Sequence, residues 1–422
     1  MGIADTENKD IDIEVHGLAP KQLEEILDTL GERINIGESF GIYALKGYGI
    51  DIAMPRSEKN TGSGHRDLEV SVDPFIGVYK AAKRRDFTVN SIMQDILTGE
   101  ITDNFGGVED IKNRVIRHVS DETFADDPLR VLRAAQLAAR LDFTVADETI
   151  ELCRGIDLSA LSKERVEGEL KKALLKADKP SVFFETLRRA DKLSEWFPEV
   201  QALIGVPQNH KYHMEGDVWA HTMMVLDAAV KYREKAADPF GLMLAALVHD
   251  FGKAVCMQVI DGVTHAHGHE EASVPIAREF LRRIVGEKKL RSYVLSLTLY
   301  HMKPNVYARD NASVKASNKL FDSCEAKEDL IYLALADGEG KLPKVDPSRS
   351  AAYLADRLEK YRETMSQPYV TGKDLIDNGL VPGEDFSEIL AYAHKLRLAG
   401  VEKQAALKQT LVYARKKLKN AY

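Results

Sequence analysis

DIDIEV at residues 10–15 and YGIDIAMPR at residues 48–56 are the two stretches that set the fold of the N-terminal region. In both, carboxylates alternate with isoleucines, and side chains alternate between faces along a strand, so each stretch predicts a strand with one acidic face. Asp10 and Asp12 then share a face, and Glu14 points the same way. Two carboxylates on a strand edge suit a pair of Mg²⁺ ions that stabilise the attacking and leaving oxygens of a phosphoryl transfer. By itself, such a pair also fits solvated residues of a strand edge.

Asp51 is the carboxylate of the second stretch and lies between two isoleucines. Burial of such a carboxylate is costly unless it is paired or bound to a metal, so we expect a buried strand on which Asp51 joins the first acidic pair. The later stretch KRRDFTVNSI, residues 83–92, places cations next to Asp86 and Asn90. Arg84 and Arg85 can bind a triphosphate or RNA phosphates there, although a short basic run also suits a solvated turn.

The composition of the 422-residue chain is that of an ordinary globular protein, with 44% hydrophobic residues, 29% charged residues and a net charge of −8. We expect no membrane-spanning stretch and no signal peptide, because no segment looks long and apolar enough and the N-terminus is polar. Three widely spaced cysteines suggest a reducing cytoplasm rather than a disulfide framework. Any nucleic-acid surface must be a local basic one on an acidic body.

The spacing of apolar residues divides the chain. Strand patterns occupy the N-terminal part, whereas after DDPLR at residues 126–130 the apolar residues recur mostly at helical spacing. This predicts an α+β fold, with a small head of mixed sheet and helices followed by an all-helical remainder. Irregular, proline-containing segments mark the boundaries. We expect a head at residues 1–117, a helical neck at 118–205, a helical domain at 206–345 and a helical tail at 346–422.

These motifs, taken in order, resemble the class II tRNA nucleotidyltransferases, which comprise the CCA-adding enzymes and bacterial poly(A) polymerases. The DxD pair, the strand carboxylate, RRDFTVN and DDPLR all match motifs of that family, with Asp126 in place of a glutamate, and SKERVEGEL at 162–170 resembles its neck motif. The resemblance implies a polymerase-β-like head in which Asp10, Asp12 and Asp51 are catalytic and the first two hold Mg²⁺. It assigns nucleotide binding to Arg84, Arg85, Asp86, Asn90, Asp127, Arg130 and Arg133. The polar loop at 55–74 resembles the mobile loop of enzymes that add the final A.

Asp127 and Arg130 also suit base recognition on chemical grounds. They are three positions apart, so we expect them to share a helix face. A carboxylate accepts from an exocyclic amine while a guanidinium donates to a neighbouring acceptor, and both cytosine and adenine offer that combination. Uracil and guanine present a carbonyl and a ring N–H instead. The pair is therefore predicted to select C and A without a template, although an isolated DxxR also suits a surface salt bridge.

A second constellation predicts a metal site in the helical part. HDFGK at 249–253 ends an apolar stretch, and with one earlier histidine and one later aspartate it resembles the HD phosphohydrolase superfamily. The expected ligands are His221, His249, Asp250, His269, His301 and Asp337. Such ligands suit a transition metal such as Ni²⁺, Mn²⁺ or Co²⁺ that activates water against a phosphoester, although a single buried histidine is often only a core residue. Among the other eight histidines, His265 and His267 are expected in a loop, and the roles of His210 and His213 stay open.

The resemblance implies addition of CCA to tRNA 3′ ends from CTP and ATP, and a metal-dependent phosphohydrolase activity of the HD domain on 2′,3′-cyclic phosphates, 2′-phosphates or small nucleotides. The alternatives are a poly(A) polymerase, which the HD domain argues against, and an HD phosphohydrolase or RNA-binding protein with an inactive head. Expected partners are tRNA, CTP and ATP, with no membrane, and the chain is a monomer or a homodimer.

In the resembled family a strand, a Gly-Gly turn and a helix with an Arg-Asp pair precede the DxD strand. Nothing before Asp10 can play the part of that turn, although Met1-Gly2 resembles the end of the helix, so we expect a truncated head that transfers nucleotides weakly.

Overall fold

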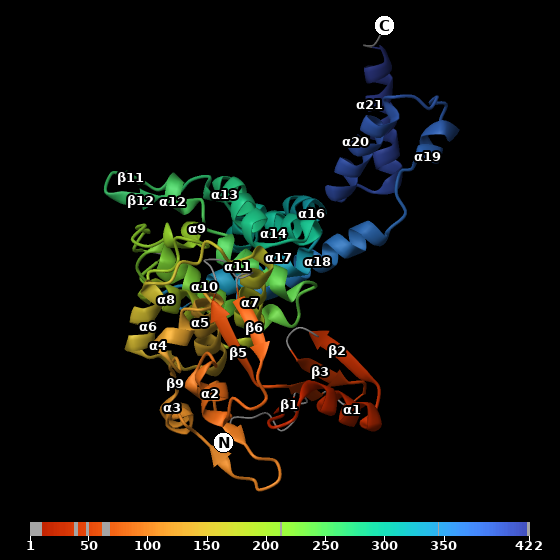
Figure 1. Ribbon diagram of the computed structural model, residues 1–422. Coiled ribbons are helices and arrows are strands. Elements are labelled where there is room, and N and C mark those ends of the chain that lie inside the picture. Colours follow the sequence, from red (N-terminus) through yellow and green to blue (C-terminus); the bar gives the residue numbers. More distant parts are fainter. Residues whose placement is uncertain are drawn as a thin grey trace. The chain divides into compact units, whose positions relative to one another are not determined.

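The computed structural model describes residues 11–37, 41–47, 50–60, 68–211, 213–344 and 346–419. The chain forms two compact units (Figure 1). The first comprises Met1–Ala177 with Val182–Trp196, and the second comprises Asp178–Ser181 with Phe197–Tyr422. Each unit has its own buried core and is described separately; the division into head, neck, helical domain and tail stays a prediction.

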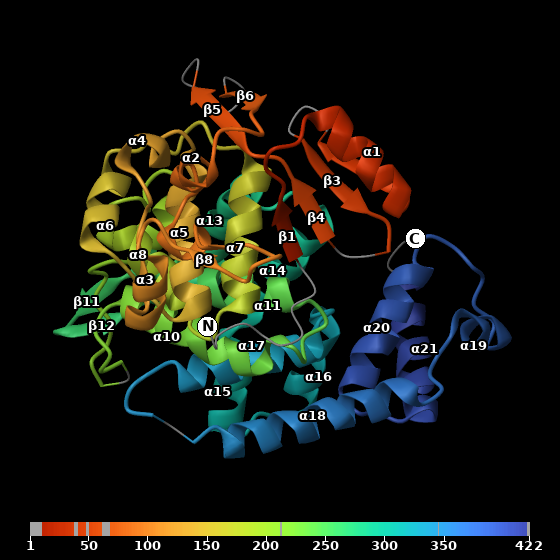
Figure 2. The same cartoon turned by 60° about the horizontal axis from the view of Figure 1, so that its bottom comes forward.

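The first unit begins with a four-stranded mixed sheet of order β1–β4–β3–β2. β1 (Ile11–Glu14) pairs in parallel with β4 (Ile50–Ala53), and β3 (Ile42–Leu45) pairs antiparallel with β4 and with β2 (Arg33–Gly37). Helix α1 (Pro20–Leu30) lies beside this sheet in both views (Figures 1 and 2). Its buried Leu23 and Leu27 form one apolar cluster with sheet residues that include Tyr43 and Ile52. Ile13, Ile50 and Ile52, predicted to alternate with carboxylates, therefore lie on the covered face of the sheet.

The rest of the first unit is mostly helical, with short strands near its start. Two-stranded pairs are β5 (Arg56–Asn60) with β6 (Leu68–Val72), β7 (Met93–Gln94) with β8 (Ile101–Thr102), and β9 (Val115–Ile116) with β10 (Thr144–Val145). The helices are α2 (Val78–Lys83), the 3₁₀ turn η3 (Thr88–Asn90), α3 (Gly107–Asn113), α4 (Asp121–Phe124), α5 (Leu129–Leu141), α6 (Asp147–Arg154), α7 (Lys163–Lys176) and α8 (Ser181–Arg189). α5 packs along α7, which brings the motifs DDPLR and SKERVEGEL together.

The second unit is built from helices around the buried helix α11 (Pro239–Val248), whose residues from Phe240 to Val248 are all buried. α11 packs against α10 (Val218–Arg233), α14 (Lys288–Tyr300) and α17 (Lys327–Glu339). The remaining helices are α9 (Pro198–Gln201), α12 (Lys253–Cys256), α13 (His269–Ile284), α15 (Met302–Asp310), α16 (Val314–Ser323), α18 (Ser348–Ser366), α19 (Gly372–Asp377), α20 (Phe386–Leu398) and α21 (Lys403–Lys419). α18 runs beside α15 and α16 (Figure 2), and α19–α21 share a separate apolar cluster.

The α+β prediction is confirmed, with two corrections. The second unit contains a hairpin, β11 (Gln258–Ile260) with β12 (Val263–His265), where only helices were expected. Its turn residues Asp261 and Gly262 both have positive φ, and Asp-Gly between β-branched residues is itself a strong hairpin signal in the sequence. In addition, residues 239–256 do pass a length and hydropathy test for a membrane span, but 78% of that stretch is buried inside the unit, as expected of a core helix.

Candidate active sites

The acidic face of the head sheet is formed by register between two neighbouring strands. Asp12 on β1 and Asp51 on β4 are direct partners across the parallel pair, so their side chains leave the same face next to each other. Both residues are exposed. The expectation that Asp51 is buried was wrong, because Ile50 and Ile52 turn toward the core and leave the carboxylate on the open face. Asp10 lies outside the described residues.

The motif RRDFTVN reaches this acidic face through Glu14. Arg84 and Arg85 each place an Nη2 near Glu14 Oε2, at 3.4 and 3.2 Å, and His16 Nε2 lies 3.0 Å from Glu14 Oε1. Since Glu14 follows Asp12 by two positions, it shares the face of the carboxylate pair. Two guanidinium groups therefore contact the carboxylate next to the exposed pair, an arrangement that suits metal ions at the carboxylates and phosphate at the cations.

The other predicted nucleotide-binding residues form a network behind the arginines. Asp86 bonds Arg133 at 2.7 Å and accepts from Asn90 Nδ2 at 3.0 Å. Arg130 donates to the backbone carbonyls of Thr123 and, at 2.8 Å, of Arg84. Arg130 thus holds the backbone of Arg84, one of the two cations predicted to bind phosphate.

Asp127 and Arg130 do not share a helix face as expected. α5 begins at Leu129, and Asp127 precedes it, accepting from the Leu129 N–H at 3.0 Å. Its other oxygen bonds Arg165 of α7 at 2.7 Å. Burial acts against ionisation of Asp127, but the hydrogen bond and charge of Arg165 lower its pKa below the usual value. The sequence showed Asp127 and Arg130 in one motif, but it did not show that Asp127 bonds to Arg165 of another motif.

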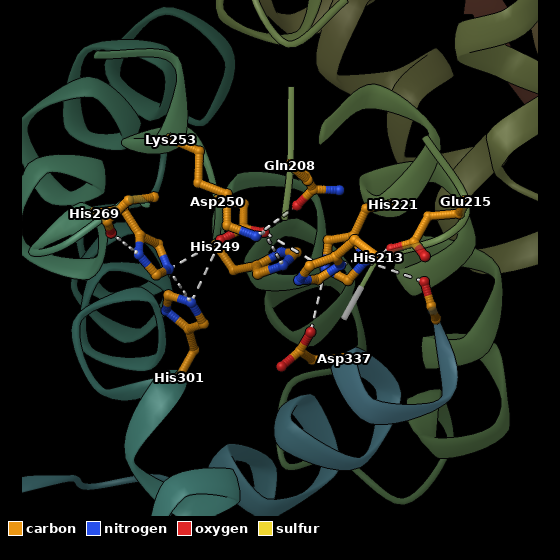
Figure 3. A network of polar contacts seen from close by, with 12 residues as sticks. Gln208, His213, Glu215, His221, His249, Asp250, Lys253, His269, His301 and Asp337 are labelled. Carbon is orange, nitrogen blue, oxygen red and sulfur yellow. Dashed lines mark hydrogen bonds and ion pairs between the residues drawn. The ribbon is translucent and has the colours of Figure 1, made fainter. Parts of the chain in front are cut away.

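The second site lies in the helical unit and brings together all six predicted metal ligands (Figure 3). His221 comes from α10, Asp337 from α17, and His269 from the start of α13. His249 and Asp250 follow α11, and His301 lies between α14 and α15. The six side chains are all buried. Helix ends and one helix interior thus place distant ligands around a single point.

Asp250 is at the centre of this cluster. Its Oδ2 lies 3.5 Å from His221 Nε2 and 3.2 Å from His249 Nε2. Its Oδ1 lies 3.2 Å from His269 Nε2 and 3.6 Å from His301 Nε2. Asp337 Oδ1 is 3.2 Å from His221 Nε2 on the first side. One carboxylate therefore faces two groups of imidazoles, one through each oxygen.

The motif HDFGK packs tightly because of its glycine. A Cβ on Gly252 would lie 2.1 Å from the carbonyl oxygen of His269. Ser273 on α13 accepts from the Gly252 N–H at 2.7 Å and donates to the His249 carbonyl at 2.8 Å. These contacts fix α13, and with it His269, against the turn that carries Asp250. Lys253 ends the motif and places Nζ 2.7 Å from Asp250 Oδ2 and 2.8 Å from Gln208 Oε1.

These residues fit a divalent metal. Among the described side chains, the Nε2 atoms of His221 and His249 are buried without a hydrogen-bond partner, and each points at Asp250. Although burial opposes ionisation, His249 and Lys253 hold the pKa of Asp250 well below its usual value. Likewise, burial opposes ionisation of Asp337, but His221 and Lys341 keep its pKa well below the usual value. Buried anions and inward-facing imidazole nitrogens are the donor set of a transition-metal site.

A cavity of about 280 Å³ opens next to these ligands. It is lined by ligands and by residues that the sequence left out, namely Gln208, Asn209, His213, Lys253, Met257, Thr264, His265, Ala266, His267, Met302 and Lys341. His267 lies in a loop as predicted, but His265 is the last residue of β12, so the loop prediction was wrong for it; their rings stack with centroids 5.1 Å apart. Lys253 had a sequence signal through HDFGK. Thr264 and His265 lie on β12, Met302 begins α15, and the others lie in irregular segments.

An acidic strand face beside arginines, joined in one chain to a buried histidine–aspartate cluster, defines a two-site metal-dependent enzyme of phosphoester chemistry. Residues 2–117 match the Poly A polymerase head domain family, and residues 218–361 match the HD domain family. The chain is 37% identical over 318 residues to the Multifunctional CCA protein of Pasteurella multocida, covering 72% of this chain and 74% of that one. It is 34% identical over 346 residues to the protein of the same name from Actinobacillus pleuropneumoniae, covering 79% and 82%. The chain belongs to the multifunctional CCA protein family.

Solved structures agree with the fold. A CCA-adding enzyme with ATP aligns with a TM-score of 0.66 at 20% identity, covering 97% of this chain and 86% of that one. The Thermotoga maritima CCA-adding enzyme complexed with tRNA aligns with a TM-score of 0.62 at 20% identity, covering 97% and 87%. These structures support the fold, while the Multifunctional CCA proteins confirm the predicted family, whose two domain types imply the use of divalent metals.

Proposed function

We propose that this protein adds CCA to the 3′ ends of tRNA from CTP and ATP, without a nucleic-acid template. The observation that carries the proposal is the register of Asp12 against Asp51, with Arg84 and Arg85 held beside them by Glu14. Asp12, together with Asp10, would hold Mg²⁺, which supplies charge stabilisation to phosphoryl transfer when bound. Asp51 orients the 3′ hydroxyl of the tRNA, and the two arginines bind the triphosphate.

Base selection is assigned to Asp127 and Arg130, with Asp86, Asn90 and Arg133 as their supporting network. The carboxylate accepts from the amine of C or A while the guanidinium donates to the adjacent acceptor. In the structure Asp127 is bonded to Arg165 and Arg130 to backbone carbonyls, so base binding exchanges these partners for the base. Arg165 thereby holds the carboxylate ionised and oriented before a nucleotide arrives.

The HD domain is proposed to hydrolyse small phosphoesters, namely 2′,3′-cyclic phosphates, 2′-phosphates or small nucleotides. His221, His249, Asp250, His269, His301 and Asp337 would hold the divalent metal, of which Ni²⁺, Mn²⁺ and Co²⁺ suit the donor set. When bound, such a metal supplies Lewis-acid activation of water and of the phosphoryl group. Lys253 and Lys341 give the adjoining cavity the positive charge that an anionic substrate requires. A cavity of about 280 Å³ sits at the lower end of the size of small-molecule sites, so it suits a mononucleotide rather than a polymer.

The proposal places the protein in the cytoplasm, with tRNA, CTP and ATP as partners and no membrane. It retains the division into a head at 1–117, a neck at 118–205, an HD domain at 206–345 and a tail at 346–422. The chain acts as a monomer or a homodimer.

The decisive experiment measures incorporation of labelled CTP and ATP into tRNA that lacks CCA, for the wild type, Asp12→Ala and Asp51→Ala. Asp28→Ala is a matched control, because Asp28 is an exposed carboxylate of the same domain. It lies on α1 and pairs with Arg33 of β2. Incorporation of both nucleotides that is lost in the two variants and kept in the control supports the proposal. Incorporation of ATP alone would indicate a poly(A) polymerase. Absence of incorporation with intact phosphoester hydrolysis would indicate an HD phosphohydrolase with an inactive head.

A further inference from the structure

Glu215 is a buried carboxylate beside the HD site that none of the predicted motifs contains. It lies in the irregular segment before α10, and its side chain is 1% exposed. Its Oε1 lies 2.7 Å from His213 Nδ1 and 3.1 Å from His221 Nδ1, and its Oε2 accepts from the Leu342 N–H at 2.9 Å. Glu215 therefore receives three donors from three segments of the chain, and Figure 3 shows two of them, the imidazoles of His213 and His221.

His221 differs from the other three imidazole ligands in how its orientation is fixed. His249, His269 and His301 each place Nδ1 at 2.7–2.8 Å from the backbone carbonyl three residues earlier in the chain. Such an acceptor keeps the proton on Nδ1 and leaves Nε2 as the lone pair that can bind a metal. These three ligands orient themselves through their own turns.

His221 sits inside α10, where the carbonyls of its own helix are already used by the helix. Its Nδ1 instead meets two acceptors from elsewhere, Glu215 Oε1 and the Gly340 carbonyl, both at 3.1 Å. Of these two, only Glu215 carries charge. A carboxylate behind a ligand imidazole fixes the ring and raises its basicity.

We infer that Glu215 is a positioning residue of the HD site, which sets the tautomer and orientation of His221 and so the metal affinity of the whole cluster. The inference rests on the proposed metal dependence of the HD domain. Glu215 would not contact the metal, because its oxygens lie at hydrogen-bond distances from three donors. The same carboxylate holds His213 at the wall of the cavity, so it organises both the ligand and the wall.

The carboxylate cannot be replaced by its amide without conflict. Both oxygens of Glu215 accept, one from the two imidazoles and one from the Leu342 N–H. Glutamine has nearly the same shape, but its amide nitrogen is a donor and would face another donor at one of these two positions. Glu215→Gln therefore tests the acceptor chemistry while hardly changing the volume.

The test measures binding of Mn²⁺ or Ni²⁺ alone to the full chain by titration calorimetry, for the wild type, Glu215→Gln and Asp329→Asn. Asp329 is the matched control: it is 1% exposed in the same unit, and it accepts from the Ala237 N–H and from Tyr293, away from the metal site. Glu215→Gln is expected to weaken metal binding about 10–100-fold, the usual effect of removing such a partner. Asp329→Asn should bind metal as the wild type does, whatever its thermal stability.

Wild-type affinity in Glu215→Gln, or an equal loss in Asp329→Asn, would overturn the inference. Should Glu215→Gln not fold, Glu215→Asp keeps the charge and shortens the reach, and unchanged metal affinity in that variant would overturn the inference as well. A wild type that neither binds metal nor hydrolyses phosphoesters would refute the proposed HD function instead, so the two failures are distinguishable.

Discussion

Replacing Gly340 by alanine is expected to disrupt the HD site through a backbone contact. Gly340 ends α17, three residues after Asp337, and an added Cβ would lie 2.5 Å from Val225 Cγ2 and 2.6 Å from Val225 Cα. Carbon atoms pack best at about 3.5–4.0 Å, so the end of α17 must move about 1 Å away from α10. The hydrogen bond from His221 Nδ1 to the Gly340 carbonyl, now 3.1 Å, would then be lost.

The magnitudes follow from that displacement. Overpacking of this kind costs about 1–3 kcal/mol, and for a domain of this size each kcal/mol lowers Tm by about 2–4 °C. A shift of about 1 Å in catalytic geometry costs on the order of 10²-fold in rate. Thermal unfolding by circular dichroism and metal-dependent hydrolysis of 2′,3′-cAMP measure the two effects, while nucleotide incorporation by the head should persist.

Gly338→Ala is the matched control, because a Cβ there meets nothing within 4 Å. In a helix that change should stabilise by about 0.5–1 kcal/mol, the opposite sign to Gly340→Ala. The reasoning would be refuted if Gly340→Ala unfolded at or above the wild-type Tm and hydrolysed substrate at the wild-type rate.

Asp12→Ala or Asp51→Ala should abolish incorporation of both CTP and ATP and leave phosphoester hydrolysis unchanged; incorporation by either variant would contradict the assignment of the acidic face. Arg130→Ala should cost about 1–3 kcal/mol of discrimination against UTP and GTP, the usual worth of a bidentate base contact, and unchanged discrimination in a competition assay would count against this. His249→Ala should lose hydrolysis of bis-p-nitrophenyl phosphate and 2′,3′-cAMP while CCA addition persists; full hydrolysis would disprove the site. Burial raises the pKa of Asp127, but Arg165 lowers it by more, so the ionised carboxylate stabilises the folded protein. Asp127→Asn should therefore destabilise the protein above the unfolded carboxyl pKa of about 3.9, and this difference from the wild type should vanish as pH falls through the lower folded pKa. Urea unfolding at pH 7 and at pH 3 checks this, and an equal loss at both would speak against the Arg165 pair.

Alternation and helical spacing were sufficient to predict the strands of the head and the helical remainder, whereas the six HD residues were predicted from the motif HDFGK and its resemblance to the HD superfamily. HDFGK could be recognised because a charged doublet at the end of an apolar helix needs a ligand, and the structure does bring its partners to it. The alternation of isoleucines and a carboxylate at residues 50–52 led to a wrong prediction of burial for Asp51. Isoleucines on both sides of a residue indicate a buried strand, but they do not show which face of that strand is covered. The exposure of Asp51 depends on α1 covering only the other face.

The contacts that could not be predicted are those between segments without periodicity. Glu215 and His213 lie in an irregular stretch, and their meeting with His221 and Leu342 depends on how two loops are joined. Arg165 belongs to a recognised motif, but its bond to Asp127 depends on the packing of α7 along α5. Spacing along the chain carries no information on such pairings.

The pairing of Asp12 with Asp51 makes catalytic competence a matter of strand register. β2, β3 and β4 can join through short antiparallel connections, whereas β1 must close a loop that encloses α1, β2 and β3 before it meets β4. Parallel, long-range pairings of this kind form slowly. If β1 paired with β4 one residue out of register, an isoleucine would lie opposite Asp51 in place of Asp12. A shift of two residues would place Asp51 opposite Glu14, which contacts the arginines. During refolding, recovery of nucleotide transfer should therefore lag behind recovery of secondary structure. The head can form its antiparallel strand pairs before β1 joins β4 and brings Asp12 next to Asp51.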